Sequence, residues 1–254
     1  MEENRICAFI DILGFSNEVK SDNVERRKKI ITLLQRISEE DTQMKVEKDG
    51  CMKYYSAEIT SFSDNIVISI PIDSKEFSLY WDSFLNKIIG VYWDALQMGL
   101  LFRGGVTIGR LYHKKNVVIG KALVDAAEIE KKANYPLIEM DEKSIEFLKS
   151  LPMYKNDSDF DRDFLYKDGK YIVNTLGYHL LVWMNYSHYN GLESMSTKMI
   201  IEIVESIIKI SESNIEKFKS ESNLKVLEKW EWFINNFIEE YNKGHWLALR
   251  KSIC

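Results

Sequence analysis

The sequence is poor in several residues and motifs that identify common protein classes. Its 254 residues include only three prolines, three cysteines and four histidines. Three cysteines far apart in the chain form neither a disulfide framework nor a paired metal-binding motif, which fits reduced thiols in a reducing compartment. HExxH, Walker A and GxGxxG motifs are missing, so zinc-hydrolase, P-loop and dinucleotide-binding classes have no support. Any chemistry must therefore depend on carboxylates, Arg or Lys side chains and the backbone.

Long runs of basic or apolar residues are missing as well. The formal net charge is -5 and no basic run is longer than residues 26–29, so we expect no nucleic-acid polymer as a partner. Apolar stretches such as residues 200–210 are interrupted well before the roughly 20 residues that a bilayer requires. The first five residues lack a signal-peptide pattern. We therefore expect a cytoplasmic protein without membrane contact.

The order of apolar patterns predicts a mixed α+β fold. Residues 6–15 are apolar apart from one Asp, which is typical of a central strand covered on both faces. Helix, hairpin, helix, strand-pair, helix and strand patterns follow at residues 24–37, 54–70, 74–98, 101–119, 122–132 and 138–140. This order predicts a ferredoxin-like, split βαβ mixed sheet with helices on its face. A strand pair is expected from about residue 161 to residue 182, around a turn at residues 168–169. Residues 199–218 and 224–241 predict a C-terminal helical hairpin.

Two aspartates are candidate metal ligands. Asp11 lies within the apolar first strand, where an uncompensated carboxylate is costly, although a strand-end Asp that accepts backbone N–H groups also explains it. Asp64 lies at the turn of the predicted hairpin, where turn geometry alone favours Asp. If that hairpin lies beside the first strand, both carboxylates meet at one edge of the sheet. Paired hard oxygen anions suit Mg²⁺ or Mn²⁺.

Glycine is concentrated in one part of the chain, with five of the twelve between residues 99 and 120. Glycine persists in a strand where another backbone or a ligand approaches closely. Arg103, beside two of these glycines, is either a phosphate-binding cation or a member of a structural ion pair. Lys121 starts a predicted helix, whose N-terminus attracts anions, or is a solvated first-turn residue. His113 falls in a polar connector that we expect to be exposed, and we assign it no role.

Several segments resemble one enzyme family. Residues 9–15 (FIDILGF) resemble the first-strand motif of the class III nucleotidyl cyclases, and residues 61–64 (SFSD) resemble their second metal-binding hairpin. Residues 103–109, 118–126, 135–136 and 168–169 resemble the pyrimidine-specific cyclases of the Pycsar antiphage systems. The resemblance covers about residues 5 to 175, which suggests a catalytic domain at 1–176 and a C-terminal helical extension at 177–254.

Departures from the purine cyclases favour the pyrimidine subgroup. Thr60 stands where adenylate cyclases have the Lys that reads adenine. Val124 and Glu128 stand where the Asn and Arg of the ordinary class III helix are expected. Leu137, in contrast, is a departure from the pyrimidine group, in which we expect a basic residue at this position.

The resemblance implies an activity and a set of site residues. The implied reaction converts UTP, or less favourably CTP, into the 3′,5′-cyclic nucleotide and pyrophosphate, as a second messenger that a separate effector senses in antiphage defence. Asp11, Asp64 and the Ile12 carbonyl would hold two Mn²⁺ or Mg²⁺ ions per active site, and Arg103 would act on the phosphates at a homodimer interface. The implied nucleotide-binding residues are Leu13, Gly14, Phe15, Tyr54, Tyr55, Thr60 and Lys121.

Two alternatives belong to other functional classes. A non-catalytic nucleotide-binding module could keep the cyclase fold, and calorimetry that detects binding without turnover would identify it. The C-terminal helical hairpin could be a protein-docking surface, or it could be a layer that covers the sheet or the dimer interface. Its apolar residues need burial, which favours the layer.

Overall fold

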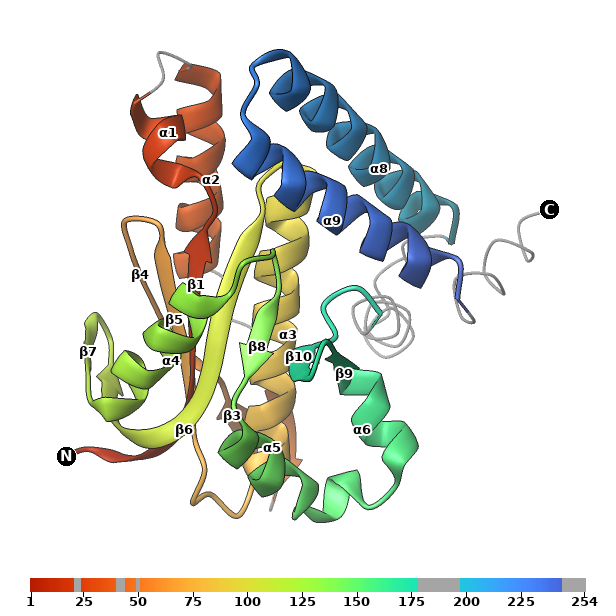
Figure 1. Ribbon diagram of the computed structural model, residues 1–254. Helices are drawn as coiled ribbons and strands as arrows, with labels where there is room; N and C mark the ends of the chain where they lie inside the picture. Colours follow the sequence, from red (N-terminus) through yellow and green to blue (C-terminus); the bar gives the residue numbers. More distant parts are fainter. Residues whose placement is uncertain (21–23, 40–43, 49–50, 178–196, 244–254) are drawn as a thin grey trace.

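A computed structural model describes residues 1–254 except 21–23, 40–43, 49–50, 178–196 and 244–254 (Figure 1). The strands are β1 (Glu3–Ile12), β2 (Met44–Lys48), β3 (Cys51–Tyr55), β4 (Glu58–Phe62), β5 (Asn65–Pro71), β6 (Phe102–Lys114), β7 (Val117–Ile119), β8 (Ile138–Met140), β9 (Phe164–Lys167) and β10 (Lys170–Val173). The helices are α1 (Phe15–Lys20), α2 (Val24–Glu39), α3 (Phe77–Gln97), α4 (Lys121–Lys132), α5 (Glu142–Lys149), α6 (Asp157–Asp163), α8 (Thr197–Ser220) and α9 (Leu224–Tyr241), with a 3₁₀ turn at Pro152–Tyr154.

The main sheet has the predicted ferredoxin-like topology. Its strand order is β4-β5-β1-β6-β8-β10-β9, with β7 paired to β6. Among the first four strands in this order, neighbouring strands are antiparallel, and the chain passes through them in the order β1, α2, β4, β5, α3, β6. Two βαβ units that interlock in this order form the split βαβ plan. The β6–β8 pair is the one parallel pair among the described strands, so the sheet is mixed. The prediction of an α+β fold with C-terminal helices is confirmed.

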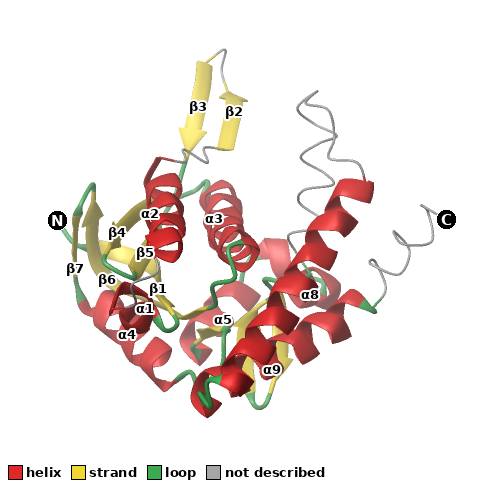
Figure 2. Cartoon of the chain, turned by 90° about the horizontal axis from the view of Figure 1, so that it is seen from above, coloured by secondary structure: helices red, strands yellow, loops and turns green. Residues whose placement is uncertain are grey.

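Helices cover both faces of the sheet. Alternate residues of β1 and β5, among them Ile6, Ile10 and Ile68, join the main core beneath α2 and α3. The opposite residues of β1, such as Cys7, pack with Ala122 and Ala126 of α4. Figure 2 shows α2 and α3 on one side of the sheet and α4 on the other. The continuous apolar pattern of residues 6–10 therefore reflects a strand buried on both faces, as predicted.

The glycines of β6 allow α4 to lie close against the sheet. A Cβ atom at Gly105 would lie 2.2 Å from the Ala126 carbonyl oxygen, and one at Gly109 would lie 3.3 Å from the Ala122 Cβ. A helix backbone, not a ligand, is thus the close neighbour of these strand glycines. The tight packing also determines where the C-terminal turn of α4 lies, directly beside the start of β6.

Replacing Gly105 with Ala is expected to lower the free energy of unfolding by about 3 kcal/mol, because α4 must move to admit the methyl group. Gly90, within α3, has no atom within 4 Å of the position of an added Cβ. Gly90→Ala is therefore the matched control, and it is expected to stabilise the protein by about 0.5–1 kcal/mol through helix propensity. Urea unfolding of both variants measures the difference, and equal shifts for the two would contradict the packing argument.

The C-terminal helices form the predicted hairpin and share the main core. Val204 and Ile207 of α8 and Trp230, Phe233 and Phe237 of α9 belong to the same contiguous apolar cluster as the sheet. The boundary at residues 176 and 177 stays a prediction. Within the described residues, no helix is long and apolar enough to cross a membrane.

Some elements differ from the sequence-based expectation. The hairpin expected at residues 54–70 consists of β4 and β5 only, whereas Tyr54 and Tyr55 belong to β3, which pairs with β2 in a separate two-stranded sheet. This small sheet projects from the body of the molecule in Figure 2. The short helices α1, α5 and α6 were not predicted, because segments of six to eight residues are too short for a helical apolar period to stand out. Part of the strand pair expected up to residue 182 lies outside the described residues.

Candidate active site

Three strand ends meet at one edge of the main sheet. In the strand register, Asp11 near the end of β1 lies opposite Asn65 of β5 on one side and Arg103 of β6 on the other. The Ile12 N–H donates to the Asp64 carbonyl oxygen at 3.2 Å. This bond ties the turn between β4 and β5 to the end of β1. The structure thereby brings Asp11 and Asp64 together at the same edge.

The Asp11 carboxyl lies in an environment that disfavours its charge. Its pKa is raised to about 7, chiefly by burial and also by the charges of Glu130 and Asp64, whereas the Arg103 charge lowers it. A side-chain hydrogen bond with Asp64 also contributes to the increase. Like charges this close disfavour joint ionisation. The pair of carboxylates therefore has negative charge that the surrounding protein compensates only in part.

Arg103 lies between the Asp11 carboxylate and the Glu130 carboxylate near the end of α4. Its Nε lies 3.6 Å from Asp11 Oδ2 and forms a close ion pair with Glu130 Oε1. The second contact is electrostatic, since the two atoms do not meet hydrogen-bond geometry. Its Nη1 donates to the Ala133 carbonyl oxygen at 3.2 Å. Arg103 is thus in an ion pair, which is one of the two roles considered from sequence, and its role as a phosphate-binding cation stays a prediction.

Glu130 is a site residue that the sequence did not single out. It is buried near the C-terminal end of α4, and burial raises the pKa of its carboxyl, whereas Arg103 lowers it. A Glu followed by two lysines near the end of a helix is expected to be a solvated residue from sequence alone. The available signal was Gly105, because a close approach of α4 at that glycine places residue 130 over the start of β6.

The donor set fits a hard divalent cation that also has ligands from a substrate. Among the described residues, no group of three or more His, Cys, Asp or Glu side chains is arranged to hold a metal. Asp11 and Asp64 supply two carboxylates, and Mg²⁺ is commonly held by one or two carboxylates together with water and substrate phosphates. A cation there would relieve the repulsion that raises the pKa of Asp11. The residues present therefore fit such an ion.

The turn after β1 is compact. Gly14 has a φ of 81°, and Phe15 begins α1. The Leu13 N–H donates to the Leu101 carbonyl oxygen at 2.9 Å, so this amide is not available to a phosphate. The phosphate-binding role predicted for residues 13–15 therefore narrows to Gly14 and Phe15, for which it stays a prediction.

The predicted base-pocket residues do not form one cluster with the carboxylates. Tyr54 is exposed, and Tyr55 is buried with its ring edge-to-face against Tyr80, 5.3 Å between centroids. Both precede β4, whereas Asp64 follows that strand, so they lie at opposite ends of it. Thr60 faces neighbouring protein groups, as described below. The nucleotide contacts of these three residues stay predictions.

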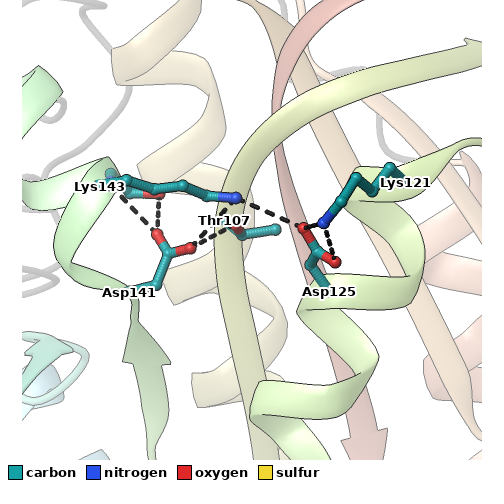
Figure 3. Close-up of polar contacts among 6 residues, drawn as sticks. Thr107, Lys121, Asp125, Asp141 and Lys143 are labelled. Carbon is teal, nitrogen blue, oxygen red and sulfur yellow. Dashed lines mark hydrogen bonds and ion pairs between the residues drawn. The ribbon is translucent and has the colours of Figure 1, made fainter.

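Lys121 lies at the other end of α4 from Glu130. The two residues are nine positions apart in the helix, or about 14 Å along its axis. Lys121 Nζ lies 2.7 Å from Asp125 Oδ1, and Lys143 links Asp125 to Asp141 with contacts of 3.4 and 3.5 Å (Figure 3). Thr107 also donates to Asp141 at 2.5 Å. This network joins α4 to the start of α5, and the structure does not bring Lys121 to Asp11.

His113 is buried, so the expectation of an exposed connector was wrong. The strand β6 continues through this position, and the tip of the β6–β7 hairpin packs against β4 and β5. His113 Nε2 lies 2.9 Å from Thr60 Oγ1, which donates to the Lys115 carbonyl oxygen at 2.6 Å. Its Nδ1 lies 2.8 Å from Ser69 Oγ, and Ser69 Oγ accepts from Arg5 Nε at 2.8 Å. These bonds assign a neutral ring with the proton on Nε2.

Acid is expected to weaken this network. Burial and the nearby Arg5 charge lower the pKa of His113 to about 4. The unfolded chain binds a proton near the ordinary His pKa of about 6.5, so stability is lost as pH falls from about 6.5 to about 4, by about 3 kcal/mol in total. The free energy of unfolding of His113→Gln should fall less than that of the wild type over the same pH interval. Urea unfolding at several pH values measures this, and parallel curves for the two proteins would contradict it.

Comparisons with known proteins identify no family for this chain. No protein-family model matches the sequence, and no curated protein matches it. One similar solved structure is the catalytic core of a rhodopsin-guanylyl cyclase with converted specificity, in complex with ATPαS. The match has 13% sequence identity and a TM-score of 0.38, and it covers 68% of this chain and 95% of that chain. A similarity at this level supports no conclusion about activity, so function must be inferred from the geometry of this chain.

Proposed function

We propose that this protein is a nucleotidyl cyclase that converts UTP, or less favourably CTP, into the 3′,5′-cyclic nucleotide and pyrophosphate. The observation that carries the proposal is the meeting of Asp11 and Asp64 at one sheet edge, with Arg103 held 3.6 Å from Asp11. Paired carboxylates beside a fixed guanidinium suit a substrate that brings phosphates and divalent cations together. The preference for a pyrimidine depends on the resemblance described above.

In the proposed reaction, the ribose 3′-oxygen attacks the α-phosphorus, and the bond from that phosphorus to the bridging oxygen of pyrophosphate breaks. The 3′-hydroxyl proton passes to solvent. Asp11, Asp64 and the Ile12 carbonyl would hold Mg²⁺ or Mn²⁺, which when bound lowers the pKa of the hydroxyl and neutralises phosphate charge. Arg103 orients and neutralises the phosphates from its position against Glu130.

A homodimer with active sites at the interface remains part of the proposal. Phe62 exposes 46% of its surface one residue before the turn that carries Asp64. Val117 and Ile119 of β7 are exposed as well. Phe62 lies beside the site, whereas β7 lies at the opposite end of β6. Large apolar side chains exposed together are typical of surfaces that bind a partner. Sedimentation of the full chain tests the association. The product is proposed to act on a separate effector in antiphage defence, as the resemblance implies.

The direct test is incubation of the purified chain with each of the four nucleoside triphosphates and Mn²⁺, followed by chromatography of the products. The proposal predicts a cyclic nucleotide from UTP, with CTP as the second substrate. A folded protein that forms no cyclic nucleotide from any of the four would refute the enzyme proposal. A cyclic purine product would keep the activity and refute the pyrimidine assignment.

One observation favours a non-catalytic nucleotide-binding module as the second candidate. Val124 and Glu128, which stand at the helix positions of the class III Asn and Arg, are both exposed on α4. Neither side chain can donate a hydrogen bond to a transition state. Calorimetry that detects Mg²⁺-dependent nucleotide binding without any turnover would select this candidate.

A further inference from the structure

Helix α9 lies across the same end of the molecule as the carboxylate edge (Figure 1). It is anchored on Tyr135, in the connection between α4 and β8. The Trp232 ring stacks on the Tyr135 ring with 5.0 Å between centroids and an interplanar angle of 9°. The Tyr135 hydroxyl donates to Glu228 Oε1 at 3.3 Å. Residues 228 and 232 are one turn apart, so a single face of α9 contacts Tyr135.

A second anchor fixes the direction of α9. Lys167 of β9 donates to Asn236 Oδ1, and its ammonium lies 5.6 Å from the centroid of the Trp232 ring. The apolar side of the helix, with Trp230 and Phe233, is buried in the main core. Contacts with Tyr135 and with Lys167 therefore fix α9 against the sheet-containing part of the chain.

This docking brings Lys229 to the carboxylate edge. The residue that follows Glu228 is half-buried, and the Arg103 guanidinium that faces Asp11 also donates to Ala133, two residues before Tyr135. The Lys229 ammonium is within electrostatic reach of both Arg103 and Asp11. Burial and Arg103 lower the pKa of Lys229, whereas Asp11 and Glu228 raise it. Among the described residues, no hydrogen bond or ion pair engages this ammonium.

We infer that Lys229 binds a substrate phosphate, so that the C-terminal helical hairpin supplies one wall of the nucleotide site within the same chain. The inference rests on the proposed function for the nature of the substrate. Arg103 is already paired with Glu130 and Asp11. Lys229 is half-buried beside this second cation, and its ammonium has no hydrogen-bond or ion-pair partner within the described part of the chain. A half-buried ammonium in this position gains most from an anionic ligand.

The arrangement is complementary to a metal-bound triphosphate. Several charges of each sign are gathered at the edge: the carboxylates of Asp11, Asp64 and Glu130, and the cations of Arg103 and Lys229. A divalent cation relieves the first repulsion and a phosphate relieves the second. A protein-docking role for the hairpin accounts for its apolar residues but not for this charge.

The test compares Lys229→Met with Lys225→Met in the full chain. Lys225 is exposed one turn earlier on α9 and acts on Lys229 least among the charges around it, so its replacement makes the same charge change without removing a half-buried ammonium. Calorimetry with inorganic triphosphate and Mg²⁺ reports the phosphate site without any nucleoside or turnover. Lys229→Met should weaken this binding about tenfold, as expected for one lost charge-assisted hydrogen bond. Lys225→Met should bind within twofold of the wild type, and Lys229→Arg should retain most of the affinity.

Kinetics and stability separate the outcomes. With an active enzyme, Lys229→Met should raise KM for the nucleotide about tenfold and change kcat less, whereas a purely structural role would lower the melting temperature and leave KM unchanged. Wild-type binding of triphosphate by Lys229→Met would overturn the inference while leaving the cyclase proposal intact. If the wild type binds triphosphate but forms no cyclic product, loss of binding in Lys229→Met supports the inference and only the cyclase proposal fails. No triphosphate binding by the wild type overturns the inference.

Discussion

Replacing Asp64 with Asn is expected to lower the rate of cyclic nucleotide formation by about a thousandfold, which corresponds to about 4 kcal/mol of transition-state stabilisation. The change removes one anionic oxygen ligand and leaves the side chain nearly the same size. Because the Asp64 carbonyl, not its side chain, accepts the Ile12 N–H, the backbone geometry of the edge should persist. Steady-state rates at saturating Mn²⁺, with folding checked by circular dichroism, measure the effect.

Asp73→Asn is the matched control for this variant. Asp73 is exposed in the segment after β5, at the opposite end of that strand from Asp64. Asp73→Asn makes the same chemical change just beyond the β4–β5 hairpin, and the turnover of this variant should stay within a factor of two of the wild type. If Asp64→Asn retained a third or more of wild-type turnover, Asp64 would not be a metal ligand, even if the activity itself were real.

Asp11→Asn is expected to abolish turnover and at the same time to stabilise the metal-free protein. The Asp11 carboxylate is disfavoured by burial and by the charges of Glu130 and Asp64, and Asn carries no charge. A gain of about 1 kcal/mol corresponds to a rise of about 2–4 °C in melting temperature for a chain of this size. A residue that serves only the fold would show the opposite sign on replacement.

The pH dependence of this gain follows from the raised pKa. The folded state keeps a proton on Asp11 up to about pH 7, whereas the unfolded chain releases it near pH 4. The wild type therefore loses stability from this group as pH rises from about 4 to about 7. The melting temperature of Asp11→Asn should exceed that of the wild type most at pH 7 and least at pH 4. Added Mg²⁺ should narrow the gap by stabilising only the wild type. A lower melting temperature for Asp11→Asn at pH 7 would contradict the charge argument.

Much of the fold could be predicted from local patterns. The apolar run at residues 6–10 indicated a strand buried on both faces, and the turn at residues 61–64 indicated the hairpin that places Asp64 beside Asp11. The unusual glycines indicated a close approach. These signals are strong because burial on two faces, tight turns and missing side chains each limit the sequence locally.

The rest of the site depends on contacts between distant parts of the chain. Glu130 and Lys229 belong to helices and each has a charged neighbour in the sequence, so from sequence they resemble solvated positions. Only the packing of α4 on Gly105 and of α9 on Tyr135 brings them to the carboxylate edge. His113 was misassigned for a similar reason, because a polar connector reads as exposed unless its partners on other strands are known.

The reaction class is tested most directly by ³¹P NMR of UTP turnover by the full chain, quenched with EDTA. Ring closure predicts a cyclic phosphodiester signal and a pyrophosphate signal that grow in equal molar amounts, and neither should grow with Asp64→Asn. Formation of uridine monophosphate with pyrophosphate, or of the diphosphate with inorganic phosphate, would show that water attacks the substrate instead and would contradict a cyclase.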